Sequence, residues 1–259
     1  TVLTHGLTPS LYIHIPLCAR KCDYCDFFSC TPESFPNGKG SIPGRISDSL
    51  IREITTLEKE HGVSAWNTVY IGGGTPSLLP SDDLSRLCAS FSCAGEVSIE
   101  ANPESITPEW ISAAANAGIT RLSLGIQSFH EPLLTAAGRN GSPESNRRAL
   151  SLLNDHWSGE LSADLICGLP GQTEDMLLED IRELTRSTVT HISLYSLIVE
   201  EGTPLSSRLD SKVISLPEDE SELWFRARDT LEESGFLQYE ISNFAKPGSE
   251  CRHNLVYWN

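Results

Sequence analysis

Short apolar runs recur along the chain, and each one ends in a polar or glycine-rich turn. The runs are rich in Ile, Leu, Val or Tyr and too short for helices, so each one predicts a buried β-strand. The predicted strands span residues 11–15, 68–71, 96–100, 121–125, 162–166 and 191–197.

Segments with helical periodicity separate these strands. In residues 46–60, Ile51, Ile54 and Leu57 fall on one face of a helix. The same spacing occurs in residues 82–90, 108–117, 142–154 and 174–186. Strands and helices that alternate in this way indicate βα units and a parallel sheet. Six units are too few to close an eight-stranded barrel, so we expect an α/β fold, a partial (β/α)6 TIM-like barrel.

Two stretches interrupt the alternation. Residues 29–45 are rich in Pro, Gly and Ser and predict a long loop. After residue 200 the βα rhythm stops, and a helix over residues 223–233 and a strand near residues 239–242 are expected instead. The chain is therefore divided into a core of residues 1–200 and a short C-terminal helix and strand extension of residues 201–259.

Composition and charge narrow the classes of function. The chain has 259 residues, 39% of them hydrophobic, and a formal charge of −16 from 19 basic and 35 acidic residues. So acidic a surface repels nucleic-acid phosphates and anionic lipids. No apolar run reaches the roughly 18–20 residues that span a bilayer, and the first ten residues do not resemble a signal peptide. We therefore expect a cytoplasmic protein that binds no nucleic acid and is not integral to a membrane.

Three of the eight cysteines are crowded into eight residues, directly after the first predicted strand. Cys18, Cys22 and Cys25 form a Cys-x3-Cys-x2-Cys motif. Thiolates suit iron–sulfur clusters and zinc, and such crowding indicates metal rather than disulfides. Three thiolates can hold three corners of a [4Fe–4S] cubane and leave the fourth iron open, as a chemically active metal site requires.

The alternatives need ligands that the sequence does not offer nearby. A structural zinc site needs a fourth ligand, and an electron-transfer ferredoxin needs a fourth cysteine at matching spacing. Cys30 is interpreted as a thiol outside the cluster. Cys88, Cys93 and Cys167 lie on or beside apolar positions and are interpreted as small buried hydrophobic residues.

Unusual residues follow the later strands, at the barrel end where ligands bind. The turn Gly72-Gly73-Gly74-Thr75 lets backbone approach a ligand, although it fits neither a P-loop nor a dinucleotide fingerprint. Asp164 lies in an otherwise apolar strand, which is costly unless the carboxylate is paired, for example with Arg139 or Arg121, or bound to a ligand. The other residues of this kind are Glu100, Gln127, Tyr195 and Ser196, of which the last two fit either the core or a cleft.

The cysteine motif, with Tyr24 just before its third cysteine, resembles the signature of the radical S-adenosylmethionine (SAM) superfamily. The resemblance implies that SAM chelates the open iron. It also implies that one electron from the reduced cluster cleaves the S–C5′ bond of SAM and gives a 5′-deoxyadenosyl radical. It also implies that Tyr24 packs near the adenine. The partial barrel is accordingly expected to be of the radical SAM type.

The full set of motifs is similar to the coproporphyrinogen III dehydrogenase-like group, which comprises HemN dehydrogenases and HemW heme chaperones. The resemblance extends from Leu11 to Trp258 and implies one or two bound SAM molecules. The residues that it matches to the SAM site are Tyr12, Gly73, Gly74, Thr75, Glu100, Gln127, Arg139 and Asp164.

Two features resemble the HemW branch of this group. Cys25 is followed by Asp26 and Phe27, whereas the dehydrogenase branch carries a Cys-x-Cys pair at this point. The segment from His253 to Trp258 also resembles a HemW element, which makes His253 a candidate heme ligand and Tyr257 a weaker one. Leu17 and Asp23 depart from the family pattern, which has an aromatic residue and a proline there. The C-terminal part is expected to be shorter than in the family.

The resemblance thus implies a heme chaperone that binds heme and delivers it to hemoproteins, with an electron donor for its cluster as a further partner. The alternative is an oxygen-independent coproporphyrinogen III dehydrogenase, an oxidoreductase that decarboxylates two propionates in porphyrin biosynthesis. Other radical SAM chemistry, or a cluster that only stabilises the barrel, also stays open. A homodimer is compatible with either function.

Overall fold

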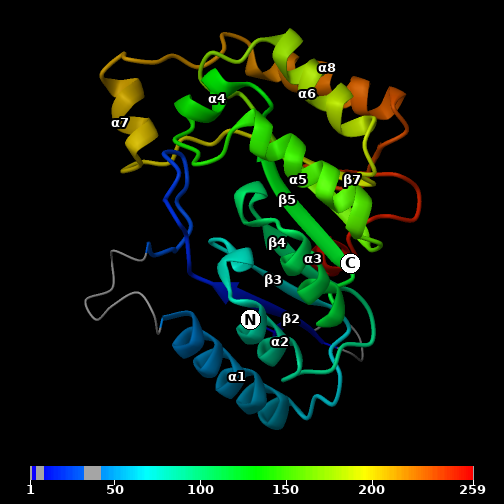
Figure 1. Ribbon diagram of the computed structural model, residues 1–259. Coiled ribbons are helices and arrows are strands. Elements are labelled where there is room, and N and C mark those ends of the chain that lie inside the picture. Colours follow the sequence, from blue (N-terminus) through cyan, green and yellow to red (C-terminus); the bar gives the residue numbers. More distant parts are fainter. Residues whose placement is uncertain (1, 4–8, 32–41, 259) are drawn as a thin grey trace.

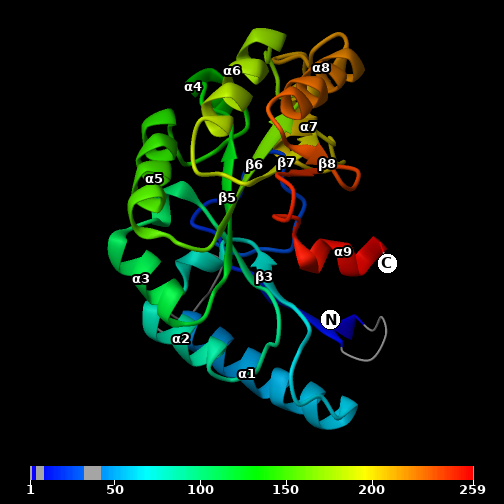
Figure 2. The same cartoon turned by 90° about the vertical axis from the view of Figure 1, so that its right-hand side faces the viewer.

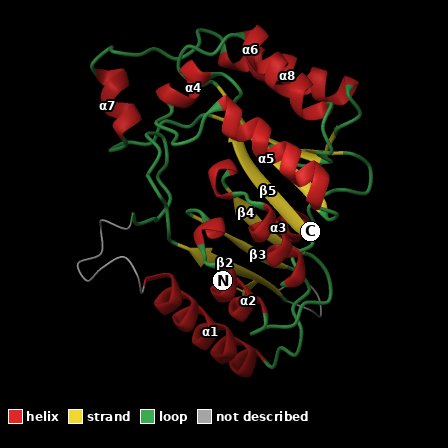
Figure 3. Ribbon diagram, viewed as in Figure 1, coloured by secondary structure: helices red, strands yellow, loops and turns green. Residues whose placement is uncertain are grey.

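A computed structural model describes residues 2–3, 9–31 and 42–258, and its described part contains one nine-stranded sheet (Figures 1 and 3). All six predicted strands are present and run parallel to one another. They are β2 (Ser10–Ile15), β3 (Val69–Gly73), β4 (Val97–Ala101), β5 (Arg121–Gln127), β6 (Glu160–Cys167) and β7 (His191–Ser196). The prediction of a parallel barrel core is confirmed.

The sheet does not close on itself. Its strand order is β1-β2-β3-β4-β5-β6-β7-β9-β8, and the three outer strands pair antiparallel. These are β1 (Val2–Leu3), β8 (Leu237–Gln238) and β9 (Asn243–Ala245). The fold is therefore the expected partial barrel.

Helices cover the outer face of the curved sheet (Figure 2). The helices that were predicted are α1 (Ile42–His61), α2 (Ser81–Cys88), α3 (Pro108–Asn116), α5 (Pro143–His156), α6 (Glu174–Thr185) and α8 (Glu220–Glu233). Thr107, Ser142 and Thr173 cap three of them by accepting backbone N–H bonds. No helix in the described part is long and apolar enough to cross a membrane.

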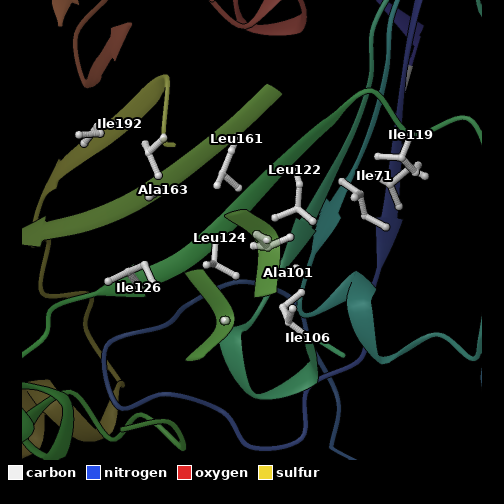
Figure 4. Packing of buried hydrophobic residues seen from close by; sticks show 14 of the residues in the cluster. Ile71, Ala101, Ile106, Ile119, Leu122, Leu124, Ile126, Leu161, Ala163 and Ile192 are labelled. Atoms are coloured by element: carbon white, nitrogen blue, oxygen red, sulfur yellow. The ribbon is translucent and has the colours of Figure 1, made fainter. Parts of the chain in front are cut away.

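The hydrophobic core lies between this outer face and the helices. Strand residues such as Ile71, Leu122, Leu124 and Ile192 are fully buried there (Figure 4). The other face of each strand is polar: in β2, for example, Tyr12 and His14 alternate with the buried Leu11, Ile13 and Ile15. The alternation points polar side chains into the barrel interior, where the site is built.

Several elements differ from the predictions. Residues 239–242 form the turn between β8 and β9 rather than a strand, because the strands lie on either side of them. Of the predicted loop 29–45, residues 32–41 lie outside the described part, and α1 begins at Ile42, earlier than its apolar periodicity indicated. The unpredicted short helices are α4 (Glu131–Ala136), α7 (Pro204–Asp210), α9 (Arg252–Trp258), η2 (Pro76–Leu78) and η3 (Pro103–Ser105).

The segment after residue 200 packs into the same body as the rest. Strand β9 pairs with β7, and the side chains of Phe236 and Phe244 are fully buried in the main core. Helix α9 lies across the inner face of the sheet, opposite the helices that cover its outer face (Figure 2). The extension therefore completes the sheet and covers part of its polar face.

Candidate functional site

A cavity of about 330 Å³ opens at the carboxyl ends of the parallel strands. Cys18, Cys22 and Cys25 all line it, and the loop after β2 that carries them supplies only part of its wall. The other predicted residues in its lining are Tyr24, Gly73, Gly74, Thr75, Glu100, Gln127, Arg139 and Asp164. Residues from five different strand ends and the cysteine loop thus meet in one place.

Backbone bonds hold the cysteine loop at both ends. Cys18 N–H donates to Cys30 O (3.0 Å), and Cys30 N–H donates to Pro16 O (2.8 Å). Cys25 N–H donates to Cys22 O (3.2 Å) and forms a tight turn between these two cysteines. Burial raises the pKa of the Cys25 thiol. Low-dielectric surroundings favour the neutral thiol until a metal binds the thiolate.

Two polar side chains contact the cysteine sulfurs. Thr75 Oγ1 lies 3.9 Å from Cys18 Sγ, and Arg139 Nη1 lies 3.7 Å from Cys22 Sγ. Within the described ranges, no three Cys, His, Asp or Glu side chains converge closely enough to hold a single metal ion. Around one tetrahedral zinc, thiolates lie about 3.8 Å apart. A cubane does not need that convergence, because its thiolates bind separate irons.

Gly74 is required by the close approach of the turn after β3 to the cysteine loop. A Cβ at this position would lie 2.5 Å from Leu17 O and 2.9 Å from Cys18 Sγ. Gly74 N–H donates to Ile15 O (2.9 Å), and Thr75 N–H donates to Leu17 O (2.6 Å). Gly74 therefore allows the chain to approach itself closely, and Gly73 and Gly74 also line the cavity.

Two buried carboxylates face the cavity. Burial raises the pKa of Glu100 to about 7, and the nearby Asp164 adds to the rise against bonds from Tyr70 and Gly73. Burial likewise raises the pKa of Asp164 to about 6, although hydrogen bonds from Ser193 and Ser123 oppose it. Such a pair favours a cationic ligand, which would relieve the unfavourable burial of negative charge.

Arg139 provides a positive charge in the wall of the cavity. Its Nη2 donates to Gly125 O (2.7 Å) and to Asn102 Oδ1 (3.3 Å). Burial lowers its pKa, but the neighbouring Tyr24 hydroxyl and Cys22 thiol raise it overall, so the guanidinium stays charged. Among the described residues, neither Arg139 nor Arg121 forms an ion pair with Asp164. Arg121 pairs with Glu96 instead (2.7 Å).

Gln127 has a backbone conformation that non-glycine residues rarely adopt. Its φ is +66°, at a register shift between β5 and β6 that follows Gly125. After the shift Gln127 pairs with Leu165 at the last position of β5, and its side chain lines the cavity. Strained backbone of this kind is concentrated at binding and catalytic sites.

Tyr12 and His253 do not line the cavity. The Tyr12 ring stacks on Tyr70 with a centroid separation of 6.1 Å, and its hydroxyl lies 3.2 Å from His14 Nδ1. Tyr70 in turn donates to Glu100 (3.0 Å). Tyr12 is therefore linked to the cavity wall through one intervening ring.

His253 lies inside the barrel near the amino ends of the strands, at the opposite end from the cysteines. Its Nδ1 bonds with Thr68 Oγ1 (2.8 Å), which precedes β3, and its backbone N–H donates to Glu96. The residue is only 2% exposed, its Nε2 has no hydrogen-bond partner in the described part, and burial lowers its pKa to about 4. The Tyr257 ring packs 5.9 Å away.

The cavity also contains residues that were not predicted. Tyr195 and Ser196, for which core and cleft both stayed open, line the cavity. The lining residues that were missed include Tyr70, Asn102, Ser123 and Gly125. A signal for three of them was available, because polar or small residues alternate with apolar ones along each strand and must face away from the helices.

The cysteines outside the motif are free thiols in other places. Cys88 and Cys167 are buried, as predicted, and burial raises the pKa of each thiol to about 12. Cys93, which forms an isolated backbone bridge with Trp66, is only half-buried, unlike the prediction. Cys30 does not line the cavity.

Comparisons with known proteins show what the chain is similar to. The family model for the radical SAM superfamily matches residues 12–184. Heme chaperone HemW of Mycobacterium tuberculosis (strain CDC 1551 / Oshkosh) is 37% identical over 98% of this chain and 68% of its own length. Heme chaperone HemW of Lactococcus lactis subsp. lactis is 34% identical, over 96% of this chain and 65% of its own length. The chain thus spans about two thirds of these curated relatives.

A solved structure shares the fold. Coproporphyrinogen III oxidase (HemN) from Escherichia coli superposes with a TM-score of 0.80 at 23% identity. The match covers 92% of this chain and 56% of the HemN chain. At this identity the similarity establishes the shared partial barrel only.

Proposed function

The chain belongs to the radical SAM superfamily, and on that premise we propose that Cys18, Cys22 and Cys25 bind three irons of a [4Fe–4S] cluster. The superfamily implies a cluster of this type and SAM. The single observation that carries the assignment is the cavity, in which all three cysteines meet the polar strand ends. The departures at Leu17 and Asp23 leave these three thiols in place.

The residues around the cavity fit SAM in charge. The carboxylates of Glu100 and Asp164 suit the cationic amino and sulfonium groups, and the Arg139 guanidinium suits the carboxylate. Tyr24, Gly73, Gly74, Thr75 and Gln127 complete the wall that would enclose the ligand. When bound, the cluster supplies one electron to SAM.

Iron and sulfide content tests the cluster assignment. Anaerobic reconstitution should yield near four irons and four sulfides per chain, as a cubane requires. Cys22→Ala should lose most of both, whereas Cys93→Ala, which changes a half-buried cysteine outside the cavity, should retain them. Full iron content in Cys22→Ala would refute this ligand set.

The function that we propose is that of a heme chaperone, which binds heme and delivers it to recipient hemoproteins. Its support is the identity of 34–37% to proteins named heme chaperone HemW. In addition, Cys25 is followed by Asp26 and Phe27, so the Cys-x-Cys pair of the dehydrogenase branch is absent from this motif. An electron donor for the cluster is part of the proposal, as is action in the cytoplasm.

His253 is the proposed heme ligand. Because its Nε2 is buried and has no hydrogen-bond partner among the described residues, iron could reach that nitrogen only if α9 moved away from the sheet. Heme titration followed by absorption should give a Soret shift with the unaltered protein. The shift should weaken strongly in His253→Ala and persist in His156→Ala, which changes an exposed histidine at the end of α5.

An activity assay separates this proposal from the alternative. The protein is incubated anaerobically with SAM, a reductant and coproporphyrinogen III. We expect no protoporphyrinogen. Its formation, in amounts that Cys22→Ala does not produce, would identify a dehydrogenase and overturn the chaperone proposal.

A further inference from the structure

The segment between Cys22 and Cys25 is tied to a helix from the far end of the chain. Asp23 Oδ2 accepts a bond from Arg208 Nη1 (2.8 Å), and Arg208 belongs to α7, 185 residues along the sequence. The same Nη1 also donates to Ala136 O (2.9 Å), at the end of α4. One guanidinium therefore joins the cysteine loop, α4 and α7.

The backbone of Asp23 makes two more bonds to the same neighbours. Its N–H donates to Ala137 O (3.0 Å), and its carbonyl accepts from Leu205 N–H (2.9 Å), in the first turn of α7. The backbone N–H, the backbone carbonyl and one carboxylate oxygen of Asp23 thus bond to α7 or to the end of α4. Asp23 is not in the cavity lining, although the cysteines on both sides of it are.

Close packing surrounds this contact. A Cβ at Gly138 would lie 2.3 Å from Asp23 Oδ1, and Gly138 has a φ of +66°, so the position suits only glycine. Leu205 is fully buried in a small apolar cluster that also contains Ala137, and Tyr24 packs against that cluster. Helix α7 is therefore seated firmly beside the loop.

The ion pair is also more sheltered than a comparable surface pair. The side chains of Arg208 and Asp23 are 33% and 18% exposed, whereas those of Arg226 and Glu174 are 52% and 45% exposed. Partial shelter reduces screening by water and salt. The hydrogen bond from Arg208 to Ala136 O adds a fixed anchor, whereas within the described ranges the Arg226 guanidinium bonds only to Glu174.

From these contacts we propose that Arg208, through Asp23, is a positioning residue that holds the Cys22–Cys25 turn in place for the cluster. The inference rests on the proposed cluster and deepens it, because retention of the cluster would then depend on α7, outside the motif. Loss of an outer-shell partner of a metal ligand typically weakens metal binding about 10–100-fold.

The test compares Arg208→Met, Asp23→Asn and the double variant with Arg226→Met, the matched control on another arginine–carboxylate pair. Each protein is reconstituted, and the rate at which a chelator removes its iron is measured. We expect Arg208→Met and Asp23→Asn each to lose iron on the order of tenfold faster than the unaltered protein. The double variant should be no worse than the worse single one, since the two residues act as a pair. Arg226→Met should match the unaltered protein.

Two further readouts separate positioning from general destabilisation. The electron paramagnetic resonance spectrum of the reduced cluster should change in Arg208→Met and return towards normal in Arg208→Lys, which keeps the charge. Hydrogen exchange of the Asp23 and Leu205 amides in the cluster-free protein should accelerate in Arg208→Met and not in Arg226→Met.

Unchanged exchange at these amides, or iron loss at equal rates in Arg208→Met and Arg226→Met, would overturn the proposal. If the unaltered protein holds no iron, the cluster assignment fails. The exchange of the two amides still decides whether Arg208 holds the turn, so the two failures are distinguishable.

Discussion

At the scale of single residues, the cavity depends on charges that are costly to bury. Glu100 and Asp164 share one cavity, and burial raises the pKa of both above the ordinary values of 4.5 and 3.8. In the folded protein these groups bind protons more tightly than in the unfolded chain. The free energy of unfolding of the ligand-free protein therefore falls as pH rises from about 4 to about 7.

Glu100→Gln should remove part of this pH dependence. Because glutamine does not ionise, the variant should gain stability relative to the unaltered protein between pH 5 and pH 8, by about 1–3 kcal/mol. Urea unfolding at several pH values measures this gain in the free energy of unfolding. Glu232→Gln, which changes an exposed carboxylate, is the control. Parallel pH profiles for Glu100→Gln and the unaltered protein would contradict the prediction.

At the scale of elements, each parallel strand has an apolar face and a polar face. Leu122 and Leu124 of β5 point into the core, while Ser123 and Gly125 point to the interior of the barrel. The turn after β3 brings its glycines against the cysteine loop, so strand ends and loop form one wall. An element that is polar on one side in this way fits an open barrel around a polar ligand.

Gly74→Ala should open this wall. The added methyl group would lie 2.5 Å from the Leu17 carbonyl, so the turn after β3 and the cysteine loop must separate. We expect a loss of about 1–3 kcal/mol of stability together with reduced iron binding. Gly44→Ala is the control, because its Cβ would meet nothing closer than 3.8 Å. Normal iron content in Gly74→Ala would show that the contact is dispensable.

At the scale of the whole molecule, a buried polar network joins the barrel to its C-terminal segment. Arg121 is only 2% exposed, pairs with Glu96 and donates to Ser162 Oγ. Its Nη2 also donates to the carbonyls of Ser249 and Glu250, just before α9. We therefore propose that residues 1–200 and 201–259 fold as one unit, although the alternation of strands and helices in the sequence stops after residue 200.

Arg121→Met should be severely destabilising. It leaves the Glu96 carboxylate buried without its cation, which typically costs about 3–5 kcal/mol. Arg147→Met breaks an exposed pair with Glu183 and should cost about 1 kcal/mol or less. Denaturant unfolding distinguishes the two. Equal losses in both variants would mean that Arg121 contributes no more than a surface ion pair.

A chain that ends after residue 200 should not fold. Truncation removes β9, which pairs with β7, and the buried side chains of Phe236 and Phe244. It also exposes the inner face that α9 covers. Circular dichroism and hydrogen exchange of the truncated chain should resemble an unfolded or molten state. A cooperative unfolding transition in that chain would establish an independent core.

The amino-acid sequence by itself was enough to identify the six parallel strands, six of the helices that cover them and the cysteine motif. These depend on local signals: apolar runs, helical periodicity, capping residues and the spacing of Cys18, Cys22 and Cys25. The same local signals placed most of the strand-end residues at one edge of the sheet, because parallel strands share that edge.

Contacts between distant segments were decided only by tertiary structure. The pairing of Asp23 with Arg208, the burial of His253 opposite Thr68, and the choice of Glu96 rather than Asp164 as the partner of Arg121 each join residues far apart in sequence. Such pairs leave no periodic signal along the chain, since they depend on where a strand points its polar face and where a later helix returns. The motif thus determined which thiols could bind a metal, whereas the returning segments determined what surrounds and holds them.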